Sequence, residues 1–255
     1  MKKTLIAASL ALVSASSFAF NEAPLAKHDL KIVSEHRDHF SRNYMELGSN
    51  FGMVGPGILM TTLEYHTWSK DNSKILGGSI TDKDMHSVDS LYVPGFMYFI
   101  PVSKTVAIGP AAKYEFNSGY RSMFKAGIAG MYNPGNGFYG MAMYRFDRGM
   151  SSDVKPNNYD MVNMDRKDLM VGYKSAEWNI NLRGSHFHFV ESQTKQILDS
   201  LGHDGQFAEA ELIAEYNGYN NFSPYVSAIW ESTGKYMNPT AYGNSGFSVG
   251  VKLHF

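Results

Sequence analysis

The sequence predicts an all-β protein, a transmembrane antiparallel up-and-down β-barrel of about twelve strands. Residues 246–255 alternate strictly between an apolar row that ends in Phe255 and a small or polar row. That period of two is typical of a strand with one apolar and one wet face. Aromatic residues make up 14% of the chain, which suits the aromatic girdles of a membrane barrel. The connections, described below, also sort by length as they do in such barrels.

The first three strands are expected at 27–36, 42–51 and 58–68. In each of them apolar residues alternate with charged or polar residues, as Ile32 does with Lys31 and Leu63 with Glu64. The glycines and the proline within 52–57 predict a tight turn between the second and the third strand.

The next four strands are expected at 86–100, 105–116, 122–132 and 138–146. Pro94 and Gly95 predict a bend or bulge in the first of these, and they leave open which of its faces is apolar. The alternation is clearer later, where Arg145 lies between Tyr144 and Phe146. Residues 133–137, Asn-Pro-Gly-Asn-Gly, predict a turn.

The last five strands are expected at 166–174, 178–190, 207–216, 224–231 and 246–255. The third of these alternates alanines with glutamates, and the second alternates Ile180 and Leu182 with Asn181 and Arg183. Each pattern again separates an apolar face from a polar face.

The lengths of the connections favour a membrane barrel over a soluble one. Connections after the even-numbered strands are short, whereas the longest ones follow odd-numbered strands, at 69–85, 147–165, 191–206 and 232–245. Outer-membrane barrels have short periplasmic turns and long extracellular loops. The connections after the first and the fifth strand are also short, so a secreted β-sandwich stays open as an alternative.

The first nineteen residues predict a secretory signal peptide. Lys2 and Lys3 precede an apolar run at 5–13 and the small residues that end at Ala19. This run is too short to cross a bilayer as a helix. We therefore expect residues 1–19 to be a signal peptide and residues 20–255 to be an outer-membrane β-barrel, with a buried N-terminal helix as the alternative.

The composition excludes several classes of function. The net charge is −1, which supplies no excess of positive charge for nucleic acid. The chain has no cysteine, so disulfides and thiolate sites are excluded. The 15 methionines are dispersed along the sequence and are interpreted as apolar gap-fillers. We expect no cofactor.

The charges of the wet face predict a water-filled lumen, because unpaired buried charge is costly. Basic residues dominate the fifth to ninth strands, and acidic residues dominate the tenth and eleventh strands and continue into the first three. This predicts a transverse field, although a lumen closed by salt bridges stays an alternative. The predicted pore-lining residues are Lys31, Arg42, Glu46, Glu64, Lys113, Lys125, Arg145, Lys174, Arg183, Glu209, Glu211 and Lys252.

Three segments resemble the oligogalacturonate-specific porin family, which includes the sialic-acid outer-membrane channel. They are Glu35-His-Arg-Asp-His-Phe-Ser-Arg42, Tyr144-Arg-Phe-Asp-Arg148 and Ser248-Val-Gly-Val-Lys-Leu-His-Phe255. The resemblance implies a monomeric channel in the outer membrane of a Gram-negative bacterium. It implies outer-membrane lipid as a partner and small acidic sugars, such as oligogalacturonate or sialic acid, as solutes.

Two chemical functions are alternatives to the channel. Ser185, His186, His188 and Glu191 could form a nucleophile and base, but residues on one strand do not by themselves show the required contacts. His36, Asp38 and His39 could bind a divalent metal. We predict that the protein is not an enzyme and holds no metal, and we keep a barrel hydrolase and a closed structural or adhesin barrel as alternatives.

Overall fold

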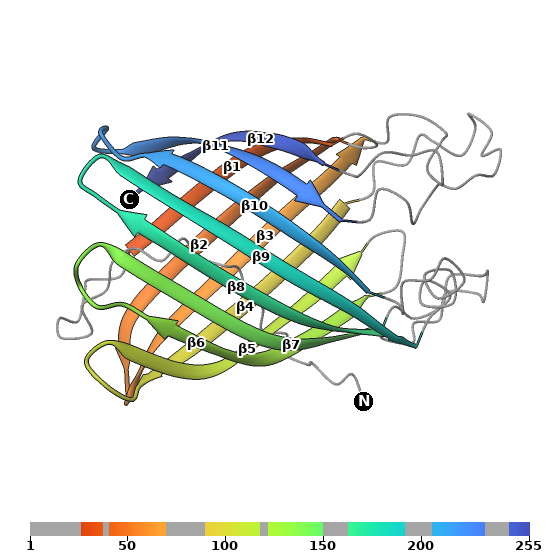
Figure 1. Cartoon of the computed structure of the whole chain (residues 1–255), viewed down its shortest axis with the longest axis horizontal. Helices are drawn as coiled ribbons and strands as arrows, with labels where there is room; N and C mark the ends of the chain where they lie inside the picture. The colour runs from red at the N-terminus through yellow and green to blue at the C-terminus, as the bar shows by residue number, and fades with distance from the viewer. Residues whose placement is uncertain are drawn as a thin grey trace, which may run out of the picture.

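A computed structural model describes residues 27–37, 41–69, 90–117, 122–149, 163–191, 206–232 and 245–255. Twelve antiparallel strands form a closed barrel (Figure 1). Each strand pairs with its neighbour in sequence, and β1 closes the barrel by pairing with β12. The predicted fold class is confirmed.

The strands are longer on average than their apolar alternation alone indicated. Their bounds are β1 Lys27–Arg37, β2 Ser41–Val54, β3 Gly57–Ser69, β4 Ser90–Pro101, β5 Val106–Asn117, β6 Met123–Tyr132, β7 Phe138–Gly149, β8 Asn163–Lys174, β9 Trp178–Glu191, β10 Gln206–Tyr216, β11 Phe222–Glu231 and β12 Gly246–His254. The signal peptide expected at 1–19 lies outside the described residues and stays a prediction.

The bulge lies on a different strand from the one predicted. The register of β4 with β3 and β5 runs through Pro94 and Gly95 without a shift. Register shifts occur instead between β8 and β9 at Asn163 and Met164, and in β2 between Asn50 and Met53. Gly52 lies between them with a φ of 67°, a left-handed conformation that glycine adopts readily in a bulge.

The two ends of the barrel differ. All five connections that follow even-numbered strands are short turns, and they lie at the same end as Phe255, on the left in Figure 1. We call this the turn end and the opposite end the loop end. At the loop end the odd-numbered strands end and the even-numbered strands begin.

The outer face of the barrel is apolar. Large aliphatic side chains such as Ile128, Leu169 and Val226 are more than half exposed. Aromatic rings contact one another at both ends of this band. Phe138 and Tyr173 do so at the turn end, with ring centroids 4.9 Å apart, and Tyr65 and Tyr92 do so at the loop end, also with centroids 4.9 Å apart. Such a surface suits lipid, because soluble proteins rarely expose apolar patches of this extent. Within the described residues no helix is long and apolar enough to cross a membrane.

Part of the interior is a dry apolar core at the turn end, on the inner faces of β3 to β8. Its members are 0–5% exposed. They are Ile58, Met60, Met97, Phe99, Ala107, Ala111, Ala129, Met131, Tyr139, Met141, Met143 and Met170. The alanines of β5 and β6 leave room for the larger side chains of the flanking strands. Methionines that are dispersed in the sequence thus pack together inside the barrel, and we call this cluster the methionine core.

Candidate functional site

The rest of the barrel interior is mainly polar, although Val33, Ile213 and Tyr225 form a small apolar cluster there. Three adjoining cavities lie within it. The one with the most charged side chains, which we call the central cavity, has a volume of about 310 Å³. Seven lysines and arginines line it, against three glutamates. The residues of the predicted pore-lining set that line the central cavity are Lys31, Arg42, Glu46, Glu64, Lys113, Lys125, Arg145 and Arg183.

Carboxylates just outside the central cavity hold its arginines in place. Arg145 donates from Nε to Asp147 Oδ1 at 2.9 Å and from Nη2 to Oδ2 at 3.1 Å. Asp147 is fully buried. Arg166 donates from Nε to Asp168 Oδ1 at 2.6 Å. Charge-assisted pairs of this kind fix the direction of a guanidinium, so the cationic groups face the cavity and the anionic groups stand behind them.

Two lysines of the central cavity are paired with glutamates that also line it. Lys113 of β5 contacts Glu64 of β3, and Lys125 of β6 contacts Glu115 of β5. Glu64 also accepts a contact from His66 Nε2 at 2.8 Å. His66 is on the wet face of its strand, as the alternation predicts, but neither His66 nor Arg166 is in the predicted pore-lining set. Arg166 was missed because it stood at the expected edge of its strand, whereas β8 begins at Asn163.

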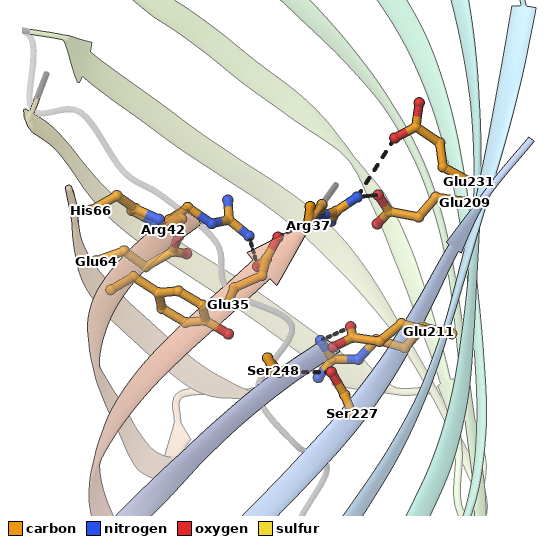
Figure 2. A network of polar contacts seen from close by, with 12 residues as sticks. Glu35, Arg37, Arg42, Glu64, His66, Glu209, Glu211, Ser227, Glu231 and Ser248 are labelled. Atoms are coloured by element: carbon orange, nitrogen blue, oxygen red, sulfur yellow. Dashed lines mark hydrogen bonds and ion pairs between the residues drawn. The ribbon is translucent and has the colours of Figure 1, made fainter. Parts of the chain in front are cut away.

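A second network crosses the barrel interior at the loop end (Figure 2). Arg37 donates from Nε to Glu35 Oε1 at 2.5 Å and from Nη1 to Glu209 Oε2 at 2.7 Å, and Glu231 Oε2 lies 3.6 Å from Nη1. Glu35 also pairs with Arg42. Arg37 thereby joins β1 to β10 and β11 across the intervening β12, so its side chain must point inward.

The network changes two expectations about the loop end. Arg37 was assigned to the turn after the first strand, but β1 continues to this residue and turns its side chain to the interior. Glu209 was predicted to line the pore, and its carboxylate is bound to Arg37. Glu211 was also predicted to line the pore, and its Oε2 lies 3.6 Å from Arg183 Nη1.

Between the central cavity and the turn end, the open space in the interior falls to a cavity of about 20 Å³. We call this narrow part the constriction. Lys31 Nζ donates to the Tyr44 hydroxyl at 3.1 Å and lies 4.7 Å from the centre of the Tyr225 ring. Lys252 Nζ donates to both carboxylate oxygens of Glu215 at 2.7 Å.

A third cavity of about 570 Å³ opens at the turn end, and we call it the vestibule. The predicted residues Lys174 and Lys252 line it. Side-chain amides, which the charge-based reasoning did not consider, also line it: Asn50, Asn179, Asn217 and Asn220. Amides can donate and accept hydrogen bonds, as a hydroxyl-rich solute requires.

The two charged walls expected from the sequence are largely neutralised by local pairing. The glutamates of β10 face Arg37, Arg183 and Lys252 from three other strands. On the strands expected to be basic, Asp147 and Asp168 pair with their arginines. Period-two alternation identifies which charges point inward, but pairing between strands decides how much field they leave.

The serine and histidines considered as a catalytic group do not meet. Ser185 Oγ donates to Asp168 Oδ1 at 2.6 Å on the inner face. His186 and His188 lie on the opposite face of the strand, because Phe187 between them is buried inside. Glu191 ends β9. In the described residues, no group of three or more potential ligands is placed to hold a metal; Asp38 and His39 lie outside those residues.

A different chain of hydrogen bonds links a serine, a histidine and an aspartate. His254 Nδ1 lies 2.6 Å from Asp29 Oδ1, and His254 Nε2 lies 2.8 Å from Ser223 Oγ. Ser223 is 1% exposed, and its hydroxyl is also 3.0 Å from Asn217 Oδ1. The chain joins β1, β12 and β11 where the barrel closes. We interpret this chain of hydrogen bonds as a structural tie, because the serine is buried and its hydroxyl is already hydrogen-bonded.

Comparison with known proteins gives a likeness of fold. No protein-family model matches the sequence, and no curated protein matches it significantly. Among solved structures, a NanC porin superposes with a TM-score of 0.60 at 14% identity, covering 89% of this chain and 98% of that one. A KdgM porin in complex with disordered oligogalacturonate superposes with a TM-score of 0.59 at 12% identity, covering 89% and 99%. The resemblance expected from the sequence is confirmed at the level of the fold.

Proposed function

We propose that this chain is a channel in the outer membrane of a Gram-negative bacterium, through which small hydrophilic solutes diffuse passively. One observation carries the proposal: a closed barrel with an apolar outer face encloses cavities lined by charged and amide side chains. A soluble barrel would have the opposite arrangement, with its apolar row inside. The fold that the chain shares with two porins supports the same function.

The expected solutes are acidic saccharides such as oligogalacturonate or sialic acid. Guanidinium groups bind carboxylates with two parallel hydrogen bonds, and Arg42, Arg145, Arg166 and Arg183 all line the central cavity. Each of them already has a protein carboxylate within reach. A solute carboxylate would therefore share these donors, and shared donors bind weakly enough to release the solute again.

We also propose how the barrel is oriented in the membrane and which surface contacts lipid. The turn end, with Phe255, would face the periplasm and the loop end the exterior, as in other outer-membrane barrels. The apolar band would contact lipid. A monomer suffices, because one chain encloses the whole set of cavities.

Single-channel recording in planar lipid bilayers tests the proposal. The folded protein should give discrete open steps, and the reversal potential in a salt gradient should indicate a preference for anions. Oligogalacturonate or sialic acid should reduce the conductance at concentrations where a neutral sugar of similar size does not.

Each part of the proposal has its own contrary result. A correctly folded barrel that stays silent would favour the closed structural barrel. Strong cation selectivity, or equal block by neutral and acidic sugars, would exclude the acidic-sugar preference while leaving the channel intact.

A further inference from the structure

The three cavities are connected through shared lining residues. Lys31, Glu46 and Arg183 line both the central cavity and the constriction. Gly48 and Glu215, together with Asp29 and Lys252, line both the constriction and the vestibule. The three cavities therefore adjoin one another in series, and this series marks a route from the loop side of the interior to the turn end.

This route is not centred in the barrel. The constriction is lined only from β1, β2 and β9 to β12. The vestibule is lined from the same strands, the adjoining turns and the last residue of β8. The opposite half of the turn end, from β3 to β8, is filled by the methionine core. An ion or sugar entering that core would lose its hydration without gaining hydrogen bonds, which is costly.

We propose, resting on the channel function above, that solutes pass only along the side of β1, β2 and β9 to β12, and that Gly48 determines the size limit. The methionine core acts as a fixed wall that forces the route against β2. Gly48 lies at that point and leaves the space of a side chain open to the route.

Size and charge are then selected at different depths. The constriction is lined by three cations and three carboxylates: Asp29, Lys31, Glu46, Arg183, Glu215 and Lys252. These charges balance, so the narrowest part discriminates by width. The cationic groups that favour anions are concentrated above it, in the central cavity.

The geometry at Gly48 makes the proposal testable. A Cβ added there would meet no heavy atom closer than the Asp29 carbonyl oxygen at 3.9 Å, which is an ordinary contact. A Cβ at this position therefore fits without moving the backbone, and the inward direction of Gly48 would aim the rest of a side chain into the route. Gly184 of β9 is a matched control, because a Cβ there meets nothing within 4 Å and it lies on the outer face between inward-facing Arg183 and Ser185.

The experiment uses cysteine variants of the full chain, which has no native cysteine. Single channels of Gly48→Cys and Gly184→Cys are exposed to a sulfonate-bearing and a trimethylammonium-bearing methanethiosulfonate. Both reagents should remove most of the conductance of Gly48→Cys, because the added group occupies the constriction whatever its charge. Neither should change Gly184→Cys.

Two further variants test the dry wall. Ala129→Cys, at a position that is 0% exposed, should not react until the protein is unfolded. Met131→Cys replaces a larger side chain in the same core, so it keeps the test available if the first variant does not fold. Reaction of either folded variant, with block, would show that the route includes the β3 to β8 side.

The outcomes separate this inference from the channel function. Absence of conductance in the unmodified protein would overturn the channel function itself. Normal conductance together with unaffected Gly48→Cys channels would overturn the eccentric route alone. Gly48→Phe, which needs no reagent, should reproduce the loss of conductance.

Discussion

Replacing Asp147 by Asn tests whether the buried carboxylates of the lumen hold its arginines in place. Asp147 is 0% exposed and accepts two bonds from Arg145, at 2.9 and 3.1 Å. Removing one partner of a buried pair costs about 3–5 kcal/mol. Because Arg145 also borders the central cavity, where water can solvate it, we expect a loss of about 2–3 kcal/mol in the free energy of unfolding.

The same two strands supply a control. Arg148 of β7 donates from Nη2 to Asp165 Oδ1 of β8 at 2.9 Å, but these side chains are 38% and 28% exposed. Asp165→Asn should therefore cost about 0–1 kcal/mol. Urea unfolding of the protein in lipid vesicles, followed by tryptophan fluorescence, measures both variants.

Channel recording gives a second readout for the same pair of variants. Asp147→Asn removes a negative charge behind the lining, so the reversal potential should move toward stronger anion preference. Asp165→Asn should leave it unchanged. Equal losses of stability in the two variants, with no difference in reversal potential, would refute the view that the inner carboxylates support and partly screen the cationic lining.

Three further changes address the constriction, the closure and the packing of the barrel. Glu215→Gln removes one negative charge from the constriction and should raise anion selectivity; an unchanged reversal potential would contradict this. His254→Ala breaks the hydrogen-bonded tie between β1, β12 and β11 and should cost about 1–3 kcal/mol in urea unfolding, whereas an unaltered midpoint would show that the tie is dispensable. Gly127→Ala would place Cβ 2.1 Å from the Tyr144 carbonyl oxygen and should lower the free energy of unfolding by about 1–3 kcal/mol. Gly184→Ala is the control, because its Cβ would lie in open space, and it should leave the free energy of unfolding unchanged. Equal effects of the two substitutions would exclude the clash as the cause.

The sequence determined most of the inward and outward assignment. A strand has a side-chain period of two, so a single clear alternation, such as the one around Lys113 or Arg183, orients a whole strand. The positions of the turns followed from glycine, proline and asparagine, as at 133–137. The sequence also favoured lipid outside the barrel, because most of the charges in the strands lie in one row.

The fourth strand is the one whose inner face the sequence does not identify. Its segment 90–101 is apolar on both faces, so no alternation identified the inner one. The structure explains the ambiguity: Met97 and Phe99 belong to the methionine core, while Tyr92 and Ile100 are exposed on the outer face. A dry interior removes the polar row on which the sequence signal depends.

Only the tertiary structure decided how the inward charges combine and where the open route runs. Arg37 meets Glu209 across a separation of 172 residues, and six methionines of the core come from five different strands. Local alternation fixes the face that a side chain occupies, because it is a property of neighbouring residues. Pairing, packing and the position of the constriction depend on the closure of the barrel, which brings together residues that no local pattern connects.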